Sequence, residues 1–410
     1  MTEHTFVFNP MSPEFQEDRH AVLKLMRESY PLYSEPDQHI SGRPFTRWTL
    51  TTYDDTLFVL RDHRFVRELR NALPAEKVPS VPDSIRSLSE SQQNTMLFRD
   101  PPDHTRLRSL INKAFTPRII RHLEPRIHDI AKHLLNEFEQ GTKLDIVRSF
   151  AFPLPVIVIA ELLGVPVEDR ELFKEWSNAF VRTLDIRPSM ETLLHGNQVT
   201  IDFREYFRNI VRERTKHPKE DLISELIHVR ESGDRLSEDE LLDMCILILM
   251  AGHETTVNLI ANAIYLMTQH PDQQLLLRNH QGLMKSAVEE VLRFESPVQV
   301  TGRTVKEDFE YNGQLLSRGD FVNVWISAAN RDPKVFNNPD TFDITRQNNR
   351  HLAFGQGIHY CLGAPLARQE GAIALSSLIN KFSSLNLSTS QVQWIPSLLM
   401  RSLKELVIEI

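Results

Sequence analysis

The chain is poor in cysteine: its 410 residues include only Cys245 and Cys361. Two thiols so far apart exclude the disulfide framework of a small secreted protein. Tracts rich in glycine and serine, low-complexity runs and internal repeats are also missing. The length alone suggests two or three domains, but because no linker is visible we expect one domain over residues 1–410.

Long apolar runs are scarce as well. The longest, residues 150–165, is interrupted by Pro153, Pro155 and Glu161 and is too short to span a membrane. Residues 1–4 lack the apolar segment of a signal peptide. We therefore expect a cytoplasmic protein with no membrane anchor. A net charge of −8, and basic residues without interleaved aromatics, argue against nucleic acid as a partner.

The segments that remain are mostly helical in pattern, so we expect a mainly α (α+β) fold with a large helical portion and a small β-rich portion. The expected helices are residues 54–60, 105–114, 119–139, 153–163, 167–184, 191–216, 238–267 and 273 to about 294. Short strands are expected from residue 46, over residues 300–325 and over residues 388–410. Residues 71–94, rich in proline and serine, predict a long irregular loop.

Cys361 is the most informative residue. It lies in the glycine-rich segment FGQGIHYCLG, residues 354–363, just before a helix expected over residues 364–380. The dipole and free N–H groups at a helix N-terminus favour thiolate over thiol. Gly355, Gly357 and Gly363 let the backbone approach something large and flat. A lone thiolate here suits the fifth ligand of a haem iron; the alternative is an inert cysteine in a turn.

The most apolar expected helix, residues 238–267, contains a polar interruption at residues 252–256, GHETT. A mid-helix glycine costs about 1 kcal/mol relative to alanine, and a buried carboxylate costs more unless it is paired. The functional interpretation is a local distortion of the helix that makes room for a diatomic ligand, to which Glu254 and Thr255 deliver protons. The alternative is a helix end, but the apolar periodicity continues through Met267.

Together these motifs resemble the cytochrome P450 family, and the absence of an anchor resembles its soluble bacterial type. The pattern Phe-Gly-x-Gly-x-His-x-Cys-x-Gly is similar to that family's haem-ligand loop, and residues 251–255 are similar to its oxygen-activation motif. Glu290 and Arg293 resemble the family's Glu-x-x-Arg pair, and Arg346 matches the arginine that completes this structural network. The resemblance covers the chain from Trp48 to its C-terminal part.

The resemblance implies haem b as the cofactor, with Cys361 as the iron ligand. Its propionates need cations, and four residues match the family's positions: His104, Arg108, Arg303 and His351. His359 ranks behind these four. Phe354, Gly355 and Ala251 are expected to contact the haem.

The resemblance also implies an apolar substrate pocket. The expected pocket residues are Leu247, Ala251, Val298, Val300 and Leu399, with Leu398 and Met400 beside them. Residues 104–123 contain five basic residues and no acid, which fits docking of an acidic electron donor. The family's soluble members take electrons from a ferredoxin or a flavodoxin and its reductase. The alternative is an ordinary solvated helix face.

The predicted function is a haem-thiolate monooxygenase that activates O2 and hydroxylates or epoxidises an apolar organic substrate. Two alternatives stay open. A peroxide-driven peroxygenase would use the same loop but typically lacks the acid–threonine pair. A non-catalytic haem protein, such as a gas sensor, leaves the polar interruption at residues 252–256 unexplained.

Overall fold

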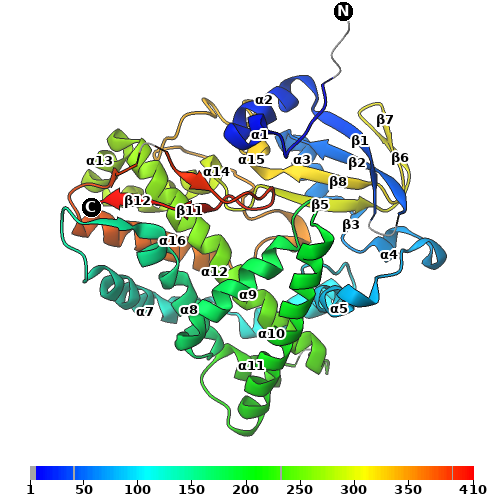
Figure 1. Cartoon of the computed structure of the whole chain (residues 1–410), viewed down its shortest axis with the longest axis horizontal. Coiled ribbons are helices and arrows are strands. Elements are labelled where there is room, and N and C mark those ends of the chain that lie inside the picture. The colour runs from blue at the N-terminus through cyan, green and yellow to red at the C-terminus, as the bar shows by residue number, and fades with distance from the viewer. Residues whose placement is uncertain (1–5, 40–41, 231–232, 390) are drawn as a thin grey trace, which may run out of the picture.

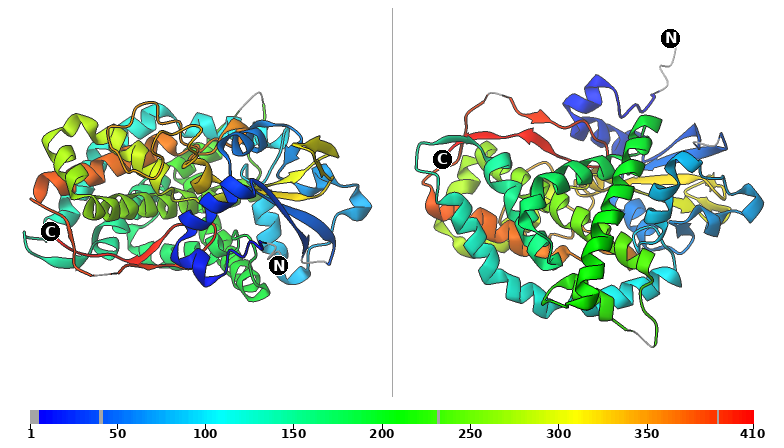
Figure 2. Two further views of the ribbon diagram at one scale, coloured as in Figure 1. Left: turned by 90° about the horizontal axis from the view of Figure 1, so that it is seen from above. Right: turned by 60° about the horizontal axis from the view of Figure 1, so that its bottom comes forward.

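The computed structural model describes residues 6–39, 42–230, 233–389 and 391–410, so residues 1–4, on which the signal-peptide expectation rests, lie outside it. Helices fill one side of the molecule and a small group of strands lies on the other (Figure 1). The two further views show the same division (Figure 2). The predicted fold, mainly helical with a small β-rich portion, is confirmed.

The helices of the N-terminal half follow the predicted pattern closely. They are α1 (Pro13–Glu17), α2 (Arg19–Ser29), α3 (Tyr53–Arg61), α4 (Leu69–Ala72), α5 (Arg86–Gln93), α6 (Asp103–Ala114), α7 (Pro117–Leu135), α8 (Pro153–Leu163), α9 (Arg170–Arg182), α10 (Met190–Lys216) and α11 (Leu222–His228). Those of the C-terminal half are α12 (Glu238–Gln269), α13 (Pro271–Asn279), α14 (Met284–Phe294), α15 (Ile326–Ala329) and α16 (Ala364–Lys381).

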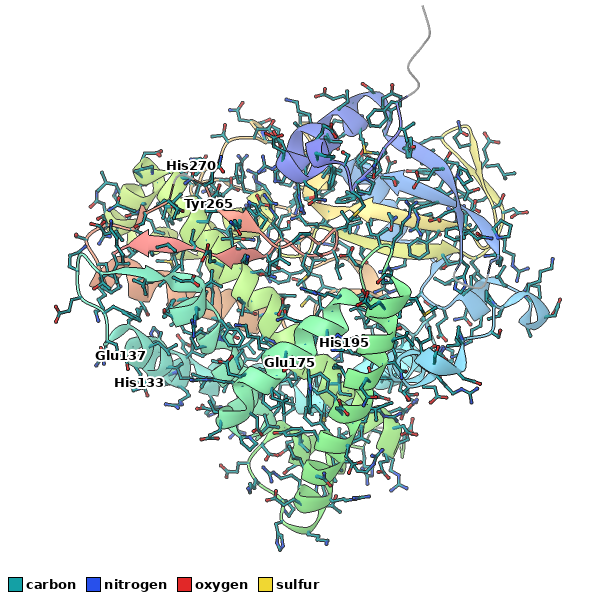
Figure 3. The ribbon with its side chains drawn as sticks, in the orientation of Figure 1. His133, Glu137, Glu175, His195, Tyr265 and His270 are labelled. Carbon is teal, nitrogen blue, oxygen red and sulfur yellow. The ribbon has the colours of Figure 1, made fainter. Side chains whose placement is uncertain are left out.

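Helix α12 runs through the middle of the helical side and packs against α8, α10 and α16. It begins at a capping box in which Ser237 and Glu240 bond each other's backbone N–H groups. Figure 3 labels Tyr265 and His270 toward its end, and Glu175 and His195 on the neighbouring helices α9 and α10. Among the described helices α12 alone is long and apolar enough to cross a membrane, but 72% of its apolar window is buried inside the protein. It is therefore the core helix.

The largest sheet has five strands in the order β1-β2-β8-β5-β3, with β2 and β8 parallel. Its strands are β1 (Leu32–Gln38), β2 (Pro44–Leu50), β3 (Phe65–Val66), β5 (Val300–Val305) and β8 (Phe321–Trp325). The hairpin β6 (Phe309–Tyr311) and β7 (Gln314–Leu316) turns at Asn312 and Gly313, both with positive φ.

The C-terminal β patch is also present. It consists of β9 (Asn386–Leu387), β10 (Gln393–Trp394), β11 (Leu403–Glu405) and β12 (Val407–Glu409). Strand β12 pairs with β9 and with β4 (Lys143–Asp145), and β10 pairs with β11. The distant segments 143–145 and 386–409 are thereby joined.

Two expectations about secondary structure are wrong. Residues 71–94 are not one irregular loop, because residues 86–93 form α5, which buries Leu88 and binds Asn197 of α10 through the Leu88 N–H. The predicted helix from residue 273 to 294 is broken at His280, so α13 and α14 are separate. In both places tertiary packing decides the outcome that local composition leaves open.

Candidate active site

A cavity of about 590 Å³ lies between α12, the Cys361 loop, α16 and the end of β5. This size is typical of sites that hold small molecules and cofactors. Nearly all of the residues predicted to hold cofactor or substrate line this one cavity: His104, Arg108, Leu247, Ala251, Glu254, Thr255, Val298, Val300, Arg303, Phe354, Gly355, Cys361 and Leu399. His351 is the exception.

The cysteine loop is shaped by backbone hydrogen bonds and two left-handed glycines. The Cys361 N–H donates to the Phe354 carbonyl at 2.9 Å, which closes the loop on itself. Gly355 and Gly357 have φ of 70° and 71°. A Cβ on Gly357 would lie 2.5 Å from the Leu60 carbonyl oxygen, so this glycine permits close packing on α3 and does not face a ligand. Gly363 does line the cavity, and a Cβ there would meet nothing within 4 Å.

The sulfur of Cys361 lies at the N-terminus of α16, where the Gly363 and Ala364 N–H groups bond it. Burial raises the pKa of the thiol and outweighs these bonds and the nearby Arg108, which lower it. The helix N-terminus expected from the sequence is present, but without a bound cation it does not by itself make a thiolate. A metal ion at the sulfur would supply the missing positive charge.

Three arginines and two histidines, all buried or half-buried, gather at this end of the cavity. They are Arg67, His104, Arg108, Arg303 and His359. The rings of His104 and His359 lie 4.5 Å apart. Burial lowers the pKa of His359, and the neighbouring arginines lower it further. Burial also lowers the pKa values of Arg67 and Arg303, and the negative charge of Asp100 opposes this lowering. The cluster is therefore poor in negative charge.

His351 is placed differently from the prediction. Its Nε2 lies 3.0 Å from Oε2 of Glu289, and Arg368 binds the same carboxylate through Nε and Nη2. Burial would raise the pKa of Glu289, but the hydrogen bonds from His351 and Arg368 lower it to about 2. The strong acid holds the imidazole away from the cavity wall. His359, ranked lower from the sequence, lines the cavity in its place.

On the opposite wall α12 carries the polar residues of the GHETT segment. The Thr255 hydroxyl donates to the Ala251 carbonyl at 2.9 Å, and the Thr256 hydroxyl donates to the Gly252 carbonyl at 3.2 Å. The helix stays α-helical throughout, so the expected distortion is absent. A Cβ on Gly252 would lie 2.6 Å from Cδ1 of Ile159, so the glycine permits packing against α8.

Glu254 has no counter-ion on the cavity wall formed by the described residues. Its side chain is 16% exposed, and His253 lies 3.9 Å away with an imidazole that is fully buried. Burial raises the pKa of Glu254 to about 7, although Lys174 and Arg182 pull it down. An acid with this pKa exchanges protons near neutral pH, which suits proton delivery.

Glu290, Arg293 and Arg346 come together outside the cavity. Arg293 binds both carboxylate oxygens of Glu290, at 2.8 and 2.7 Å, and Arg346 Nε lies 3.0 Å from Oε2. Asn349 and the Asp343 N–H complete the shell around Glu290. The remaining guanidinium donors of Arg293 bind the carbonyls of Asn330, Pro339 and Thr341. This network joins α14 to the segment that leads into the Cys361 loop.

The basic run over residues 104–123 does not form one surface. Arg106 pairs with Glu240 and Asp234, and Arg108 faces the cavity. Arg118 and Arg121 are exposed. Proximity in sequence therefore overstates the basic patch.

Sequence reasoning missed three contributors. Arg67 lines the cavity beside Arg303 and is held by the carbonyls of Leu97 and Gly302. Asp185, between α9 and α10, also lines it. Glu370 of α16 is fully buried on its wall, and burial raises the pKa of this carboxyl well above its ordinary value. The apolar residues that follow Glu370 in α16, Gly371–Leu375, were the available signal for its burial. Arg67 and Asp185 carried none.

Known proteins share this geometry. A sequence model described as Cytochrome P450 matches residues 37–408. The chain is 40% identical over 402 residues to the biotin biosynthesis cytochrome P450 of Bacillus subtilis, covering 98% of each chain. It is 40% identical over 409 residues to the polyketide biosynthesis cytochrome P450 PksS of the same organism, again covering 98% of each.

Solved structures agree with this result. The crystal structure of P450BioI in complex with hexadec-9Z-enoic acid ligated acyl carrier protein matches with a TM-score of 0.88 at 40% identity, over 97% of this chain and 99% of that one. The B. subtilis PksS structure gives the same TM-score over 98% of this chain and 99% of that one. The chain therefore belongs to the cytochrome P450 family and is a cytochrome P450 monooxygenase, an enzyme with a haem-iron cofactor.

Proposed function

We propose that the chain, as a single domain over residues 1–410, binds haem b through Cys361 and oxidises an apolar organic molecule with O2 and electrons from a ferredoxin- or flavodoxin-type protein. The observation that carries the proposal is the cavity itself. It holds one thiol at a helix N-terminus, a cluster of cations beside it, and an acid and a hydroxyl on the opposite wall.

The residues present fit a haem with two carboxylates. Both ring nitrogens of His104 are buried, and the only hydrogen-bonding group that acts on them among the described residues is the Ile358 backbone, without good hydrogen-bond geometry. A buried polar group that is poorly satisfied in this way is costly. Arg108, Arg303, His359 and His104 would hold the propionates, and the open space at Gly363 leaves room for the macrocycle. Cys245, the other thiol, is fully buried in α12, so we expect haem b to be held without covalent attachment.

Haem iron with a thiolate ligand supplies the chemistry for cleaving the O–O bond and oxidising an unactivated carbon. The protein's part is to position the substrate and to move protons. Glu254, with a pKa near 7, takes a proton from solvent and passes it toward Thr255. The Thr255 hydroxyl donates a hydrogen bond to the Ala251 carbonyl, which keeps it at the cavity wall, where it can accept that proton.

The substrate side of the cavity is apolar. Leu247, Ala251, Val298, Val300 and Leu399 all face it. Relatives have been solved with molecules that are mostly hydrocarbon: P450BioI with the carrier-bound acyl chain, CYP267B1 with myristic acid, which has a free carboxyl group, and CYP109E1 with testosterone. These complexes support an apolar substrate of similar size.

An acidic electron donor is supported by Lys113, Arg118 and Arg121, the exposed Lys and Arg residues of the basic run. We place the enzyme in the cytoplasm, where such donors and reductants are found. Turnover with donor proteins and NAD(P)H, and little turnover with peroxide alone, distinguishes this proposal from a peroxygenase.

The decisive experiment replaces the ligand. Cys361→Ser should abolish the red-shifted Soret band of the reduced carbonyl complex, whereas the matched variant Cys245→Ser should keep it. A pyridine haemochrome spectrum of the wild type identifies the haem type. Retention of the red-shifted band in Cys361→Ser would remove Cys361 as the iron ligand.

A further inference from the structure

The charges on the cavity wall are separated by sign. Apart from Cys361 and Tyr360, eight ionisable side chains line the cavity. The basic ones are Arg67, His104, Arg108, Arg303 and His359, and the acidic ones are Asp185, Glu254 and Glu370. No other Arg, Lys or His of the described chain lines it.

The basic residues form one group. His104 and His359 are in ring contact at 4.5 Å, and Arg67, Arg108 and Arg303 act on His359 by charge. Arg108 also acts on Cys361, which places the group at the cysteine end of the cavity. If the proposed function is correct, the two haem propionates take up these cations, so none is left for the substrate.

One acid on the cavity wall is held in place by hydrogen bonds. Asp185 lies in the loop between α9 and α10, and three groups hold its carboxylate. Oδ2 accepts from the Ser397 hydroxyl at 2.9 Å and from the Leu398 N–H at 3.1 Å, and Oδ1 accepts from the Ile186 N–H at 2.8 Å. These three hydrogen bonds fix the place of the carboxylate beside the pocket residue Leu399.

The cations that interact with Asp185 and Glu254 do not line the cavity. Lys174 and Arg182 act on Glu254 by charge but do not line the cavity, and Lys174 Nζ lies 4.5 Å above the Phe152 ring. Arg19 acts on Asp185 and is held by Gln299 and by the Ser397 carbonyl. Lys174 and Arg19 cannot form an ion pair with a ligand inside the cavity without leaving these positions, and Arg182 does not line the cavity.

From this arrangement we infer that the enzyme selects uncharged substrates, in which any carboxyl group is present as an ester, thioester or amide, and discriminates against free carboxylates. A free carboxylate in this cavity would be buried without a counter-ion and beside Asp185 and Glu254. Both costs disfavour binding. The inference rests on the proposed function, since it assigns the cation cluster to haem.

The test compares matched pairs of ligands on the holoenzyme. Decanoic, dodecanoic and tetradecanoic acids and their methyl esters are titrated at pH 8, by the spin-state change or by displacement of an azole inhibitor. Each ester should bind at least about tenfold more tightly than its acid. Equal or tighter binding of the acids contradicts the inference, and so does failure of every ester to bind.

A charge-neutralising variant makes the test specific. Asp185→Asn keeps a side chain of the same shape and should reduce the preference for esters severalfold. Asp129→Asn, on the exposed face of α7, should leave it unchanged. An unchanged preference in Asp185→Asn would exclude that carboxylate as its cause. The reduced carbonyl spectrum of each sample separates the two proposals. Loss of the red-shifted band would refute the proposed function. A normal band together with tight binding of the acids would refute only this inference.

Discussion

Two groups of buried arginines differ in how their charges are balanced. Arg293 and Arg346 surround Glu290, and the carboxylate and guanidinium atoms of this network bind one another and nearby backbone. Arg67 and Arg303 lie at the cavity among two histidines and Arg108, with Asp100 as the opposing acid. Burial lowers the pKa of Arg303 well below its ordinary value, and Arg67 lowers it further.

This difference distinguishes a cluster that stabilises the fold from a cluster that binds a ligand. A buried cluster in which one carboxylate binds both guanidinium groups and backbone carbonyls accept their other donors needs nothing more, and removing one partner damages the fold. A buried cluster with excess positive charge is expensive unless an anion joins it. The first cluster therefore belongs to the scaffold, and the second indicates the carboxylates of a cofactor. Substitutions in the two clusters should accordingly have different consequences.

The largest effect is expected at the balanced cluster. Glu290→Ala leaves two buried guanidinium groups without their carboxylate and should lower the free energy of unfolding by about 3–5 kcal/mol. Urea denaturation of the holoenzyme followed by far-UV circular dichroism measures it. Glu175→Ala, on the exposed side of α9, is the control and should have little effect. A loss at Glu290 as small as at the control would mean that the network is dispensable.

At the cavity the variant Arg303→Met should weaken haem binding by about 10- to 100-fold, because it removes a charge-assisted contact to a propionate. The rate of haem transfer to an excess of a haem scavenger measures this. Added haem should restore the stability of Arg303→Met by mass action but should not restore Glu290→Ala. If added haem fails to restore Arg303→Met, the two clusters do not differ as proposed.

On α12 the variant Thr255→Ala should keep haem and substrate binding but divert electrons to peroxide. We expect product formed per NAD(P)H consumed to fall by about tenfold, since positioned proton transfer contributes at least that much. Thr256→Ala removes a hydroxyl with the same type of bond one residue on and should change coupling far less. Equal coupling in wild type and Thr255→Ala would exclude this hydroxyl from proton delivery.

The last effect concerns stability alone and the acid of the same helix that has no counter-ion on the cavity wall formed by the described residues. Because the pKa of Glu254 is raised to about 7 in the folded protein, the folded state binds this proton more tightly than the unfolded state. The stability it contributes is present below about pH 4.5 and is lost as pH rises through 7.

Glu254→Gln removes this dependence. Between pH 5 and 8 the wild type should lose about 1–3 kcal/mol of stability relative to the variant. Urea midpoints at each pH measure this difference. A constant difference across the range would show that Glu254 ionises with an ordinary pKa.

Much of the site could be predicted because its residues are close in sequence or obey simple rules. The loop around Cys361 and the polar interruption on α12 each lie within about ten residues. Glycines, a thiol and a buried acid at these places are costly for folding, so a functional role is the simplest explanation for them. The i, i+3 spacing of Glu290 and Arg293 places both on one helix face through the period of the α-helix alone. These local signals also carried the resemblance to the family.

The features that the sequence did not reveal share a different cause. His351 and His359 flank the same loop, and only the position of Glu289 and Arg368 decides which one reaches the cavity. Arg106 and Arg121 belong to one basic run, but Glu240 of α12 neutralises the first. In each case the deciding partner is far away in sequence, so composition cannot reveal it.

The sequence by itself determined the helical class, the core helix α12 and the thiol that defines the family, because these depend on periodicity and on residues within one turn or loop. The tertiary structure alone decided which charges are paired. It balanced Glu290, left the cavity cations without a matching acid and fixed Asp185 beside the pocket. Charge balance depends on three-dimensional distance, and distances between remote segments arise only when the chain folds.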